Sequence, residues 1–439
     1  MTENLGIFET LAVQVTQEAQ RLTTFFNENG YYQPDFKQGG FTEFDELPPE
    51  IEASRKRLQA AAKAVQDLAA GPERYVRSLA RSYHDSTTLR WLIHFKIPEA
   101  IPLGRGESIT YSELAKKREV DENILRRIVK YAITNHIFHE PSGDVVAHTA
   151  YSAILVTDAE LRAEIDFEVE EGLSVAVNLV EAHEKWSMSD GRRNRAAFQV
   201  ANETDLEVGE FYEQDVMEER RAVFSAARPD EGVEEECLMK AFSWEKVKRV
   251  VDVGGSKGET AIALANTFPG LRIMVVDSEA RIDDGRESLP EDLERKVYFV
   301  GSDIFGEDGS MLDEVHQFGA QLYLLRNVLG KCSEEEAKIV LSNVAEVLHG
   351  AGQGAKCLIV DRVLPSCSFG LEPWDAEDAK AARHRDLHAL EMGNGAERNR
   401  EEWEALMSAA DEGLKIADIR EIDESAYSIL EVVYADSDD

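Results

Sequence analysis

Glycine and aspartate residues stand at the ends of three predicted strands in the C-terminal half of the chain. Asp252 ends an apolar run and leads into the turn Gly254-Gly255-Ser256-Lys257-Gly258, after which a helical pattern begins. Asp277 ends the next apolar run, and Asp303 follows the third one. Glycines let the backbone turn sharply and let a ligand approach without a Cβ in the way. Asp277 could accept both hydroxyls of a ribose, so the constellation predicts a site for a ribose-bearing cofactor.

NAD is the alternative ligand for this turn. The turn has the pattern GGxxG rather than the GxGxxG pattern of dinucleotide-binding sites, and the surrounding sequence shows no site for a pyrophosphate. A turn without a ligand, flanked by solvated acids, is the other alternative.

Strands must position these residues, and apolar runs of strand length alternate with helical patterns in this half. The runs are Val247–Val253, Arg272–Val276, Val297–Val300, Ala320–Leu325 and Ala355–Val360. Such alternation predicts an α/β fold, a Rossmann-like and mostly parallel sheet with helices on both faces, whose ligands bind at the carboxyl ends of the strands. We place this domain at residues 241–439.

The N-terminal half is predicted to be a helical domain, residues 1–240. Apolar residues recur at helical spacing from Leu5 to Phe26 and from Pro49 to Leu68. Core packing and a dimer contact both explain the first of these helices. Residues 108–155 read as helix, turn, helix and two short strands, which is typical of a winged helix.

Charge and composition exclude several classes of partner. The net charge is −37, from 85 acidic and 48 basic residues among 439, and it would repel nucleic-acid phosphates and anionic lipids. The four cysteines form no CxxC pair, so neither a disulfide framework nor a metal site is expected. The chain starts without a leader pattern and contains no apolar run near ~20 residues, which predicts a cytoplasmic protein without membrane contact.

Several segments together resemble the class I small-molecule O-methyltransferases of fungi and plants. They are residues 134–141, the glycine turn, Ser302-Asp303-Ile304-Phe305, residues 323–336 and Asp361-Arg362-Val363-Leu364-Pro365. The resemblance implies a homodimer formed through the helical N-terminal region, S-adenosylmethionine (SAM) as cofactor, and a small-molecule substrate. The candidate cofactor-binding residues are Asp252, Gly254, Gly255, Gly258, Asp277, Asp303, Ile304, Phe305 and Arg326.

The segment after the fourth strand departs from this family. In members of the family this segment usually has the sequence leucine, histidine, aspartate, tryptophan, and the histidine is the general base. This chain has Leu329-Gly330-Lys331-Cys332 at the same place. Glycine cannot accept a proton. The acids that flank the histidine remain, as Asp361 and Glu397. The loss weakens methyl transfer without excluding it, because positioning alone supplies much of the rate.

A narrower resemblance is to fungal pericyclases of this fold, which bind SAM without using its methyl group. They dehydrate a 2-pyridone polyketide alcohol to a quinone methide and direct its hetero-Diels–Alder or Alder-ene closure. The resemblance implies that Lys331, protonated among its acidic neighbours, donates to the pyridone carbonyl. It also implies that Met407 favours the hetero-Diels–Alder course, with core packing as the alternative.

The predicted catalytic set also includes His136 and Asp361. His136 is expected to face the substrate pocket, or else to bond within the winged-helix turn. The aromatic residues Phe41, Trp186, Phe198 and Phe211 are candidates for the wall of an apolar cavity, with ordinary core packing as the alternative.

The leading hypothesis from the sequence is a SAM-binding pericyclase that acts on a 2-pyridone polyketide. The main alternative is a SAM-dependent O-methyltransferase of a phenolic or polyketide hydroxyl. A catalytically silent homologue that serves as a dimeric partner is the third hypothesis.

Overall fold

Contacts between residues divide the chain into two compact units. The computed structural model describes residues 6–37, 39–40, 44, 47–186, 192–227, 235–306, 312–352, 354–365, 376–422 and 425–435. The first unit comprises Met1–Ser174, Tyr212–Pro229 and Cys367–Lys380, and the second comprises Val175–Phe211, Asp230–Ser366 and Ala381–Asp439. The domain boundary after residue 240 stays a prediction, and the two units are described separately below.

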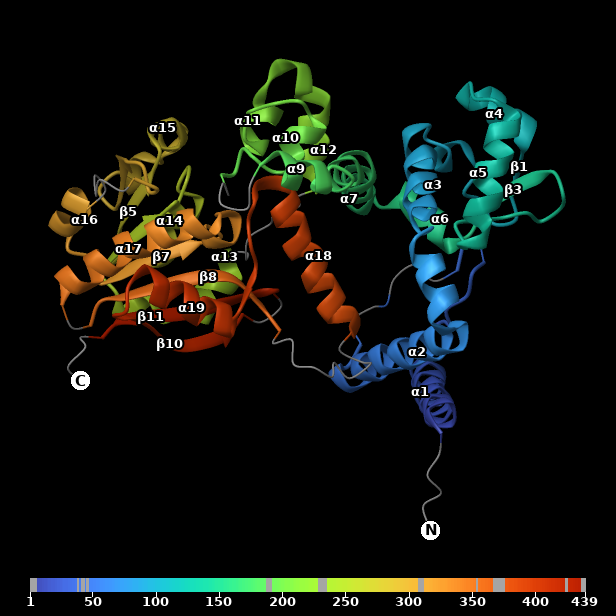
Figure 1. The fold of residues 1–439 in the computed structure, drawn as a ribbon, viewed down its shortest axis with the longest axis horizontal. Coiled ribbons are helices and arrows are strands. Elements are labelled where there is room, and N and C mark those ends of the chain that lie inside the picture. Colours follow the sequence, from blue (N-terminus) through green and yellow to red (C-terminus); the bar gives the residue numbers. More distant parts are fainter. Residues whose placement is uncertain are drawn as a thin grey trace, which may run out of the picture. The chain divides into compact units, whose positions relative to one another are not determined.

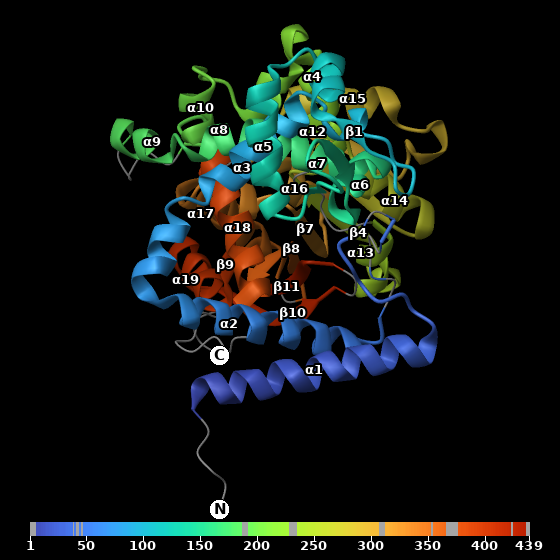
Figure 2. The same cartoon turned by 90° about the vertical axis from the view of Figure 1, so that its right-hand side faces the viewer.

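The first unit begins with two helices, α1 (Ile7–Asn29) and α2 (Pro49–Leu79), which lie side by side (Figure 2). Leu22 and Phe26 of α1 bury their side chains with Ile51 of α2, which fixes the pair. The helices expected at residues 5–26 and 49–68 are therefore confirmed. The second runs on to Leu79, across a kink at Gly71, where φ is 71°.

The winged-helix prediction is also confirmed. Helices α4 (Tyr111–Arg118) and α5 (Glu122–Thr134) pack with a three-stranded antiparallel sheet in the order β1-β3-β2. Thr110 and Asp121 accept hydrogen bonds from the first free backbone N–H groups of α4 and α5, which explains where these helices begin. The strands are β1 (Ile109–Thr110), β2 (Phe138–His139) and β3 (Val145–His148).

Further helices complete the first unit. They are α3 (Tyr83–His94), η1 (Pro98–Ala100), α6 (Ala150–Thr157), α7 (Ala159–Phe167), η2 (Glu168–Gly172), η3 (Asp215–Met217) and α12 (Glu218–Ala227). Arg220 of α12 joins this group, because its Nε donates to Glu171 at 2.6 Å and its Nη1 to Asp166 at 3.0 Å. Helices α8 (Leu173–Ala176), α11 (Val208–Glu213) and α18 (Ala376–Gly393) each span a boundary between the units.

The second unit contains the predicted mostly parallel sheet (Figure 1). Its order is β10-β11-β8-β7-β4-β5-β6, with β9 paired to β8. Strands β4 to β8 run parallel and confirm all five predicted strands, whereas β10 and β11 form an antiparallel hairpin that the sequence analysis did not assign. The strands are β4 (Arg249–Val253), β5 (Arg272–Asp277), β6 (Val297–Gly301), β7 (Leu322–Arg326), β8 (Lys356–Leu364), β9 (Arg398–Asn399), β10 (Leu414–Glu421) and β11 (Tyr427–Tyr434).

Helices cover both faces of this sheet, and successive strand residues point to opposite cores. Val251 faces the core with α17 (Glu334–Ala351) and α19 (Arg400–Ala410), while Val250 faces the core with α13 (Glu235–Ala241) and α14 (Glu259–Thr267). The α/β prediction is thus confirmed. The remaining elements are α9 (Leu179–Lys185), α10 (Ala197–Ala201), η4 (Trp244–Lys246), α15 (Glu279–Ser288), η5 (Glu291–Leu293), α16 (Leu312–Phe318) and η6 (Leu329–Lys331).

Within the described ranges, no helix combines the length and the apolar character needed to cross a membrane. The cytoplasmic location remains a prediction.

Candidate functional site

The predicted cofactor residues meet where the strand order of the sheet reverses. Strand β4 lies between β5 and β7, so the chain builds β5 and β6 on one side and then crosses over to build β7 and β8 on the other. Ligands of open α/β sheets bind in the crevice at the carboxyl ends of such a pair of strands. The glycine turn follows β4 at this point.

The turn is held in a conformation that only glycine adopts easily. Gly254 has φ 75° and Gly258 has φ 81°, both in the left-handed region. A Cβ at Gly254 would lie 2.8 Å from Val328 Cγ2 and 3.4 Å from Ile304 Cδ1. The turn therefore packs directly against the loops that follow β6 and β7, and Gly258 begins α14.

Asp277 is fixed against the turn at the end of β5. Its Oδ2 accepts the Ser256 N–H at 3.0 Å and its Oδ1 accepts the Ser278 N–H at 2.7 Å. A carboxylate has about four acceptor positions, so two bonds to backbone leave capacity for a pair of ribose hydroxyls. The predicted use of Asp277 fits this geometry.

Asp303 shapes the loop after β6. Its Oδ1 accepts the Phe305 N–H at 2.9 Å, which turns the backbone back on itself. Asn343 of α17 holds the same loop, because its Nδ2 donates to the carbonyls of Ile304 and Gly306 at 3.4 and 3.3 Å. The sequence analysis missed Asn343.

Asp252, at the end of β4, is buried and senses the charge of the half-buried Arg326. Burial raises the pKa of Asp252 to about 7, although the positive charge of Arg326 acts against the rise. Arg326 Nη1 donates to Thr260 Oγ1 at 3.0 Å, and its Nη2 lies 3.3 Å from Glu235 Oε1.

The loop after β7 carries the residues that depart from the family pattern. Asn327 has φ 54°, and the single turn η6 then contains Gly330 and Lys331. Gly330 N–H donates to Asp361 Oδ2 at 2.8 Å, and its carbonyl accepts the Ala396 N–H at 3.0 Å. A Cβ at Gly330 would lie only 2.7 Å from Asp361 Oδ1. The carboxylate of Asp361 thus occupies the space into which a side chain at position 330 would extend.

Two buried acids lie beside this loop, and burial raises the pKa of both Asp361 and Glu397. Glu397 Oε1 accepts from Arg362 Nη1 at 3.1 Å and lies 3.6 Å from Arg385 Nε. Glu397 Oε2 is also buried, and it has no hydrogen-bond partner among the described residues. Such an oxygen is a ready proton or hydrogen-bond acceptor.

The other predicted catalytic residues have different surroundings. Lys331 is exposed, and it belongs to the same short turn as Gly330. Met407 is 1% exposed and packs in the core with Leu341 and Trp403, which is the arrangement of a core residue. His136 belongs to the first unit and has a φ of 61°. Its ring stacks on that of Phe36, with 4.1 Å between the ring centroids. The catalytic roles of these residues remain predictions.

The aromatic candidates also differ in their surroundings. Phe198 is fully buried, and its ring meets the half-buried ring of Phe211 edge to face, with 5.3 Å between the ring centroids. The two therefore pack together in the second unit. Trp186 is half-buried, with Lys185 Nζ 4.4 Å above its ring. Phe41 lies outside the described residues.

Arg193 was not predicted, and it contacts the site. Its guanidinium carbon lies 4.5 Å from the centroid of the Phe305 ring. No sequence pattern predicts a contact between two residues as far apart in the chain as Arg193 and Phe305. Among the residues that the structure describes, no group of His, Cys, Asp and Glu could hold a metal ion.

Comparisons with known proteins agree with this geometry. The model of the O-methyltransferase domain matches residues 193–412, and the model of the O-methyltransferase dimerisation domain matches residues 78–158.

Among curated relatives, O-methyltransferase VdtC of Byssochlamys spectabilis is 32% identical over 439 residues, covering 97% of both chains. O-methyltransferase pgmB of Aspergillus terreus is 30% identical over 436 residues, covering 97% of this chain and 95% of its own. The solved structure of OxaC superposes with a TM-score of 0.67 at 20% identity, covering 97% of this chain and 98% of its own. This structural likeness concerns the fold alone.

Substitution of Gly254 by alanine tests the contact between the turn and the loop after β7. Its Cβ would collide with Val328 at a strained φ, so we expect the free energy of unfolding to fall by about 1–3 kcal/mol. We also expect at least a tenfold weaker SAM affinity by isothermal titration calorimetry. Gly270→Ala is the control, because a Cβ there would meet no atom within 4 Å. Equal stability and affinity in both variants would contradict the role of this contact.

Asp252→Asn tests the buried charge at the end of β4. Because the folded protein raises the Asp252 pKa from 3.8 to about 7, the parent loses stability as the pH rises from 4 to 7, by on the order of a few kcal/mol. Asparagine cannot ionise, so the stability of the variant relative to the parent, measured by urea unfolding, should rise as the pH rises from 4 to 7. Asp292→Asn, at an exposed position of η5, controls for the loss of one surface charge. A pH-independent difference for Asp252→Asn would refute the shifted pKa.

Proposed function

Because this chain belongs to the O-methyltransferase family, we propose that it is a SAM-dependent enzyme that methylates a phenolic or polyketide hydroxyl group. Family membership confirms SAM as the cofactor. The observation that carries the proposal is that Asp277 and the loop of Ile304 both pack against the glycine turn, in a chain aligned with O-methyltransferases along almost its whole length. The proposal is the main alternative of the sequence analysis, and the comparisons favour it over the pericyclase.

Five of the predicted cofactor residues have a proposed role in binding SAM. SAM supplies a methyl group on a positively charged sulfur, which is a strong electrophile. The backbone of Gly254 lets the ligand approach, and the remaining acceptor positions of Asp277 take the ribose hydroxyls. Asp303, Ile304 and Phe305 form the opposite side of the cofactor site, braced by Asn343.

The substrate hydroxyl needs a proton acceptor other than residue 330. Gly330 has no side chain, and Asp361 already accepts two backbone N–H groups. Glu397 Oε2 is buried and has no hydrogen-bond partner within the described part of the chain, and burial raises its pKa, which makes it a stronger base than an exposed glutamate. We therefore assign the deprotonation to Glu397, with Asp361 fixing the backbone of the loop.

A pericyclase is the second candidate, and the geometry around Gly330 favours it. The space for a base at this position is taken by Asp361, and an exposed lysine follows directly. Ring closure of a quinone methide requires shape, exclusion of water and a hydrogen-bond donor rather than a base. Lys331 would donate to the pyridone carbonyl, while the side-chain hydroxyl of the substrate leaves together with a proton from the hydroxypyridone as water, which gives the quinone methide before the ring closes.

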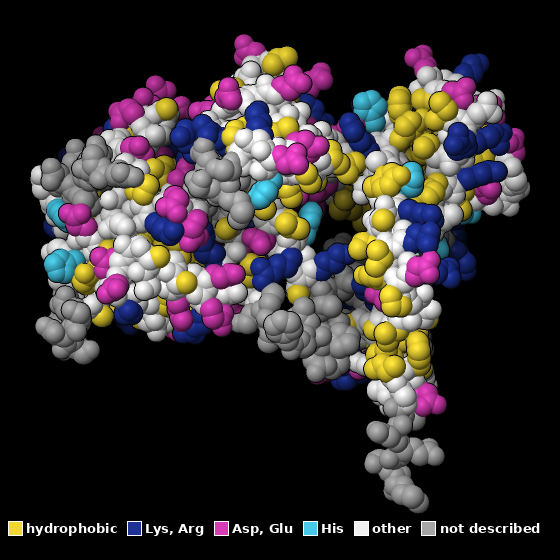
Figure 3. All heavy atoms as spheres, in the orientation of Figure 1, with side chains coloured by type: hydrophobic (Ala, Val, Ile, Leu, Met, Phe, Trp, Pro, Cys, Tyr) yellow, Lys and Arg dark blue, Asp and Glu magenta, His cyan; other side chains and the backbone are white. Residues whose placement is uncertain are grey.

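We further propose that the protein is a homodimer. The dimerisation-domain match begins at residue 78, at the end of α2. Hydrophobic side chains gather along the face of α2 and α3 (Figure 3). The exposed large apolar residues of α2 and α3 are Leu68, Tyr75, Val76, Leu79 and Tyr83, of which Val76 and Leu79 are 62% and 61% exposed. An exposed apolar stripe of this kind marks an interaction surface.

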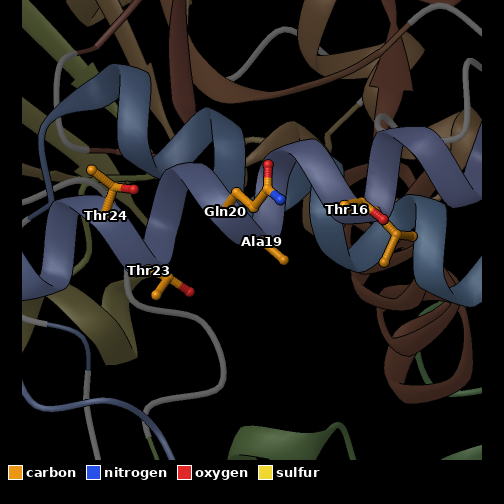
Figure 4. A pocket seen from close by; sticks show the side chains of 6 residues that line it. Thr16, Ala19, Gln20, Thr23 and Thr24 are labelled. Carbon is orange, nitrogen blue, oxygen red and sulfur yellow. The ribbon is translucent and has the colours of Figure 1, made fainter.

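The structure also has a hollow of about 610 Å³ along α1. Its lining residues come from successive turns of this one helix and are mostly small and polar (Figure 4). They are Val15, Thr16, Ala19, Gln20, Thr23 and Thr24. It holds none of the predicted site residues, so we assign no part of the reaction to it.

The first test incubates the purified protein with SAM and either a panel of phenolic polyketides or a 2-pyridone alcohol. Methylated product together with an equal amount of S-adenosylhomocysteine by mass spectrometry is expected for the methyltransferase. Cyclised, unmethylated product with SAM left intact would replace this proposal with the pericyclase. Neither product, with SAM still raising the unfolding temperature, would instead support the silent homologue.

Lys331→Ala separates the two activities in a second way. Without the lysine donor, a pericyclase should close the ring about 100-fold more slowly, because a donor aligned with the pyridone carbonyl contributes a few kcal/mol once the bound substrate covers it. Methyl transfer should change by less than about threefold, because this lysine takes no proton in the proposed reaction. Lys338→Ala, which removes a lysine from the surface of α17, is the matched control. A 100-fold loss of methyl transfer in Lys331→Ala alone would contradict the assignment to Glu397.

A further inference from the structure

Arg193 lies between the two loops that build the site. Its guanidinium stacks over Phe305, with 4.5 Å from its central carbon to the ring centroid, and its Nε donates to Glu336 Oε1 at 3.2 Å. A third contact joins its Nη2 to Glu207 Oε1 at 3.4 Å. Only 21% of the side chain is exposed, so these contacts are stronger than the same contacts at the surface.

Phe305 connects Arg193 to the cofactor loop after β6. The Phe305 N–H is bound by Asp303, and the side chain of Ile304 lies against the Gly254 turn. The three residues follow one another, so the position of the Phe305 ring constrains the backbone that carries Asp303.

Glu336 connects Arg193 to the loop after β7. While its Oε1 accepts from Arg193, its Oε2 accepts from both the N–H and the Oγ of Ser333 at 3.0 Å. Ser333 is the N-cap of α17 and comes two residues after Lys331. The two oxygens of this one carboxylate therefore join Arg193 to the point where the Gly330-Lys331 turn passes into α17.

The backbone around Arg193 is held independently. Asn394 Nδ2 donates to the carbonyl oxygens of Arg192 and Arg195 at 2.8 and 3.1 Å. The guanidinium thus extends from a fixed main chain, and its planar fork can serve a carboxylate and a ring at the same time. Lysine, which is a point charge on a flexible stem, cannot do both with the same geometry.

We propose that Arg193 is a positioning residue that couples the cofactor loop, residues 303–305, to the loop of Gly330 and Lys331. This proposal depends on the proposed function in one respect: it treats one loop as the cofactor side and the other as the substrate side of the same site. Cofactor binding that orders Phe305 then also orders the turn that presents Lys331 and the backbone of Gly330.

Hydrogen exchange of the full-length protein, followed by mass spectrometry, tests the coupling. In the parent we expect SAM to slow exchange both at Phe305 and at Ser333, whose N–H groups are bound to Asp303 and Glu336. In Arg193→Met, exchange at both sites without SAM should rise on the order of tenfold. SAM should then protect the segment around Phe305 but not that around Ser333.

Two further variants separate positioning from a general loss of stability. Arg193→Lys should keep the charge yet recover only part of the protection at Ser333. Arg220→Met removes an equally paired arginine of the first unit, and it should leave exchange at Phe305 and Ser333 as in the parent.

Two outcomes would overturn the coupling. One is unchanged ligand-free exchange at both sites in Arg193→Met. The other is SAM protection that reaches Ser333 in that variant as it does in the parent. A parent that binds no SAM would count against the proposed function instead, and the ligand-free comparison would still decide the role of Arg193.

Discussion

The close contact between the glycine turn and the loop after β7 is the constraint on which the rest of the site depends. A parallel sheet whose strand order reverses at β4 brings the ends of β4 and β7 together, and here the backbone of Gly254 packs directly against the side chain of Val328. Any larger residue at 254 would separate them. The closeness of these two ends places the cofactor turn and the loop of Gly330 next to each other, although more than 70 residues of sequence separate them.

Buried acids occur in β4, in β8 and directly before β9. Asp252, Asp361 and Glu397 all have raised pKa values because they are buried, and Arg326, Arg362 and Arg385 supply the opposite charges. A buried ionic network costs desolvation that its ion pairs repay only when the geometry is good. Its occurrence at the carboxyl end of the sheet is therefore a sign of function, because structural stability alone would be served better by apolar side chains.

Much of the fold followed from the sequence, and the reasons differ between elements. The five parallel strands are buried on both faces, so they appear as continuous runs of Val, Ile and Leu. Strands β10 and β11 escaped notice because charged residues such as Lys415, Asp418 and Glu431 interrupt their apolar positions. The glycine turn and the acids at strand ends could be found because the chemistry of a ribose site dictates them. Arg193 and Asn343 could not, because their partners lie far away in sequence and only the folded chain brings them together.

The packing of Gly330 limits what a substitution at this position could supply. The Asp361 carboxylate fills the space beside Gly330 and binds the Gly330 and Arg362 N–H groups. A histidine side chain at position 330 would meet this carboxylate at once, because a Cβ there would already lie 2.7 Å from Asp361 Oδ1. Installing an imidazole base in this chain would therefore take two changes made together, one at position 330 and one that moves or shortens residue 361.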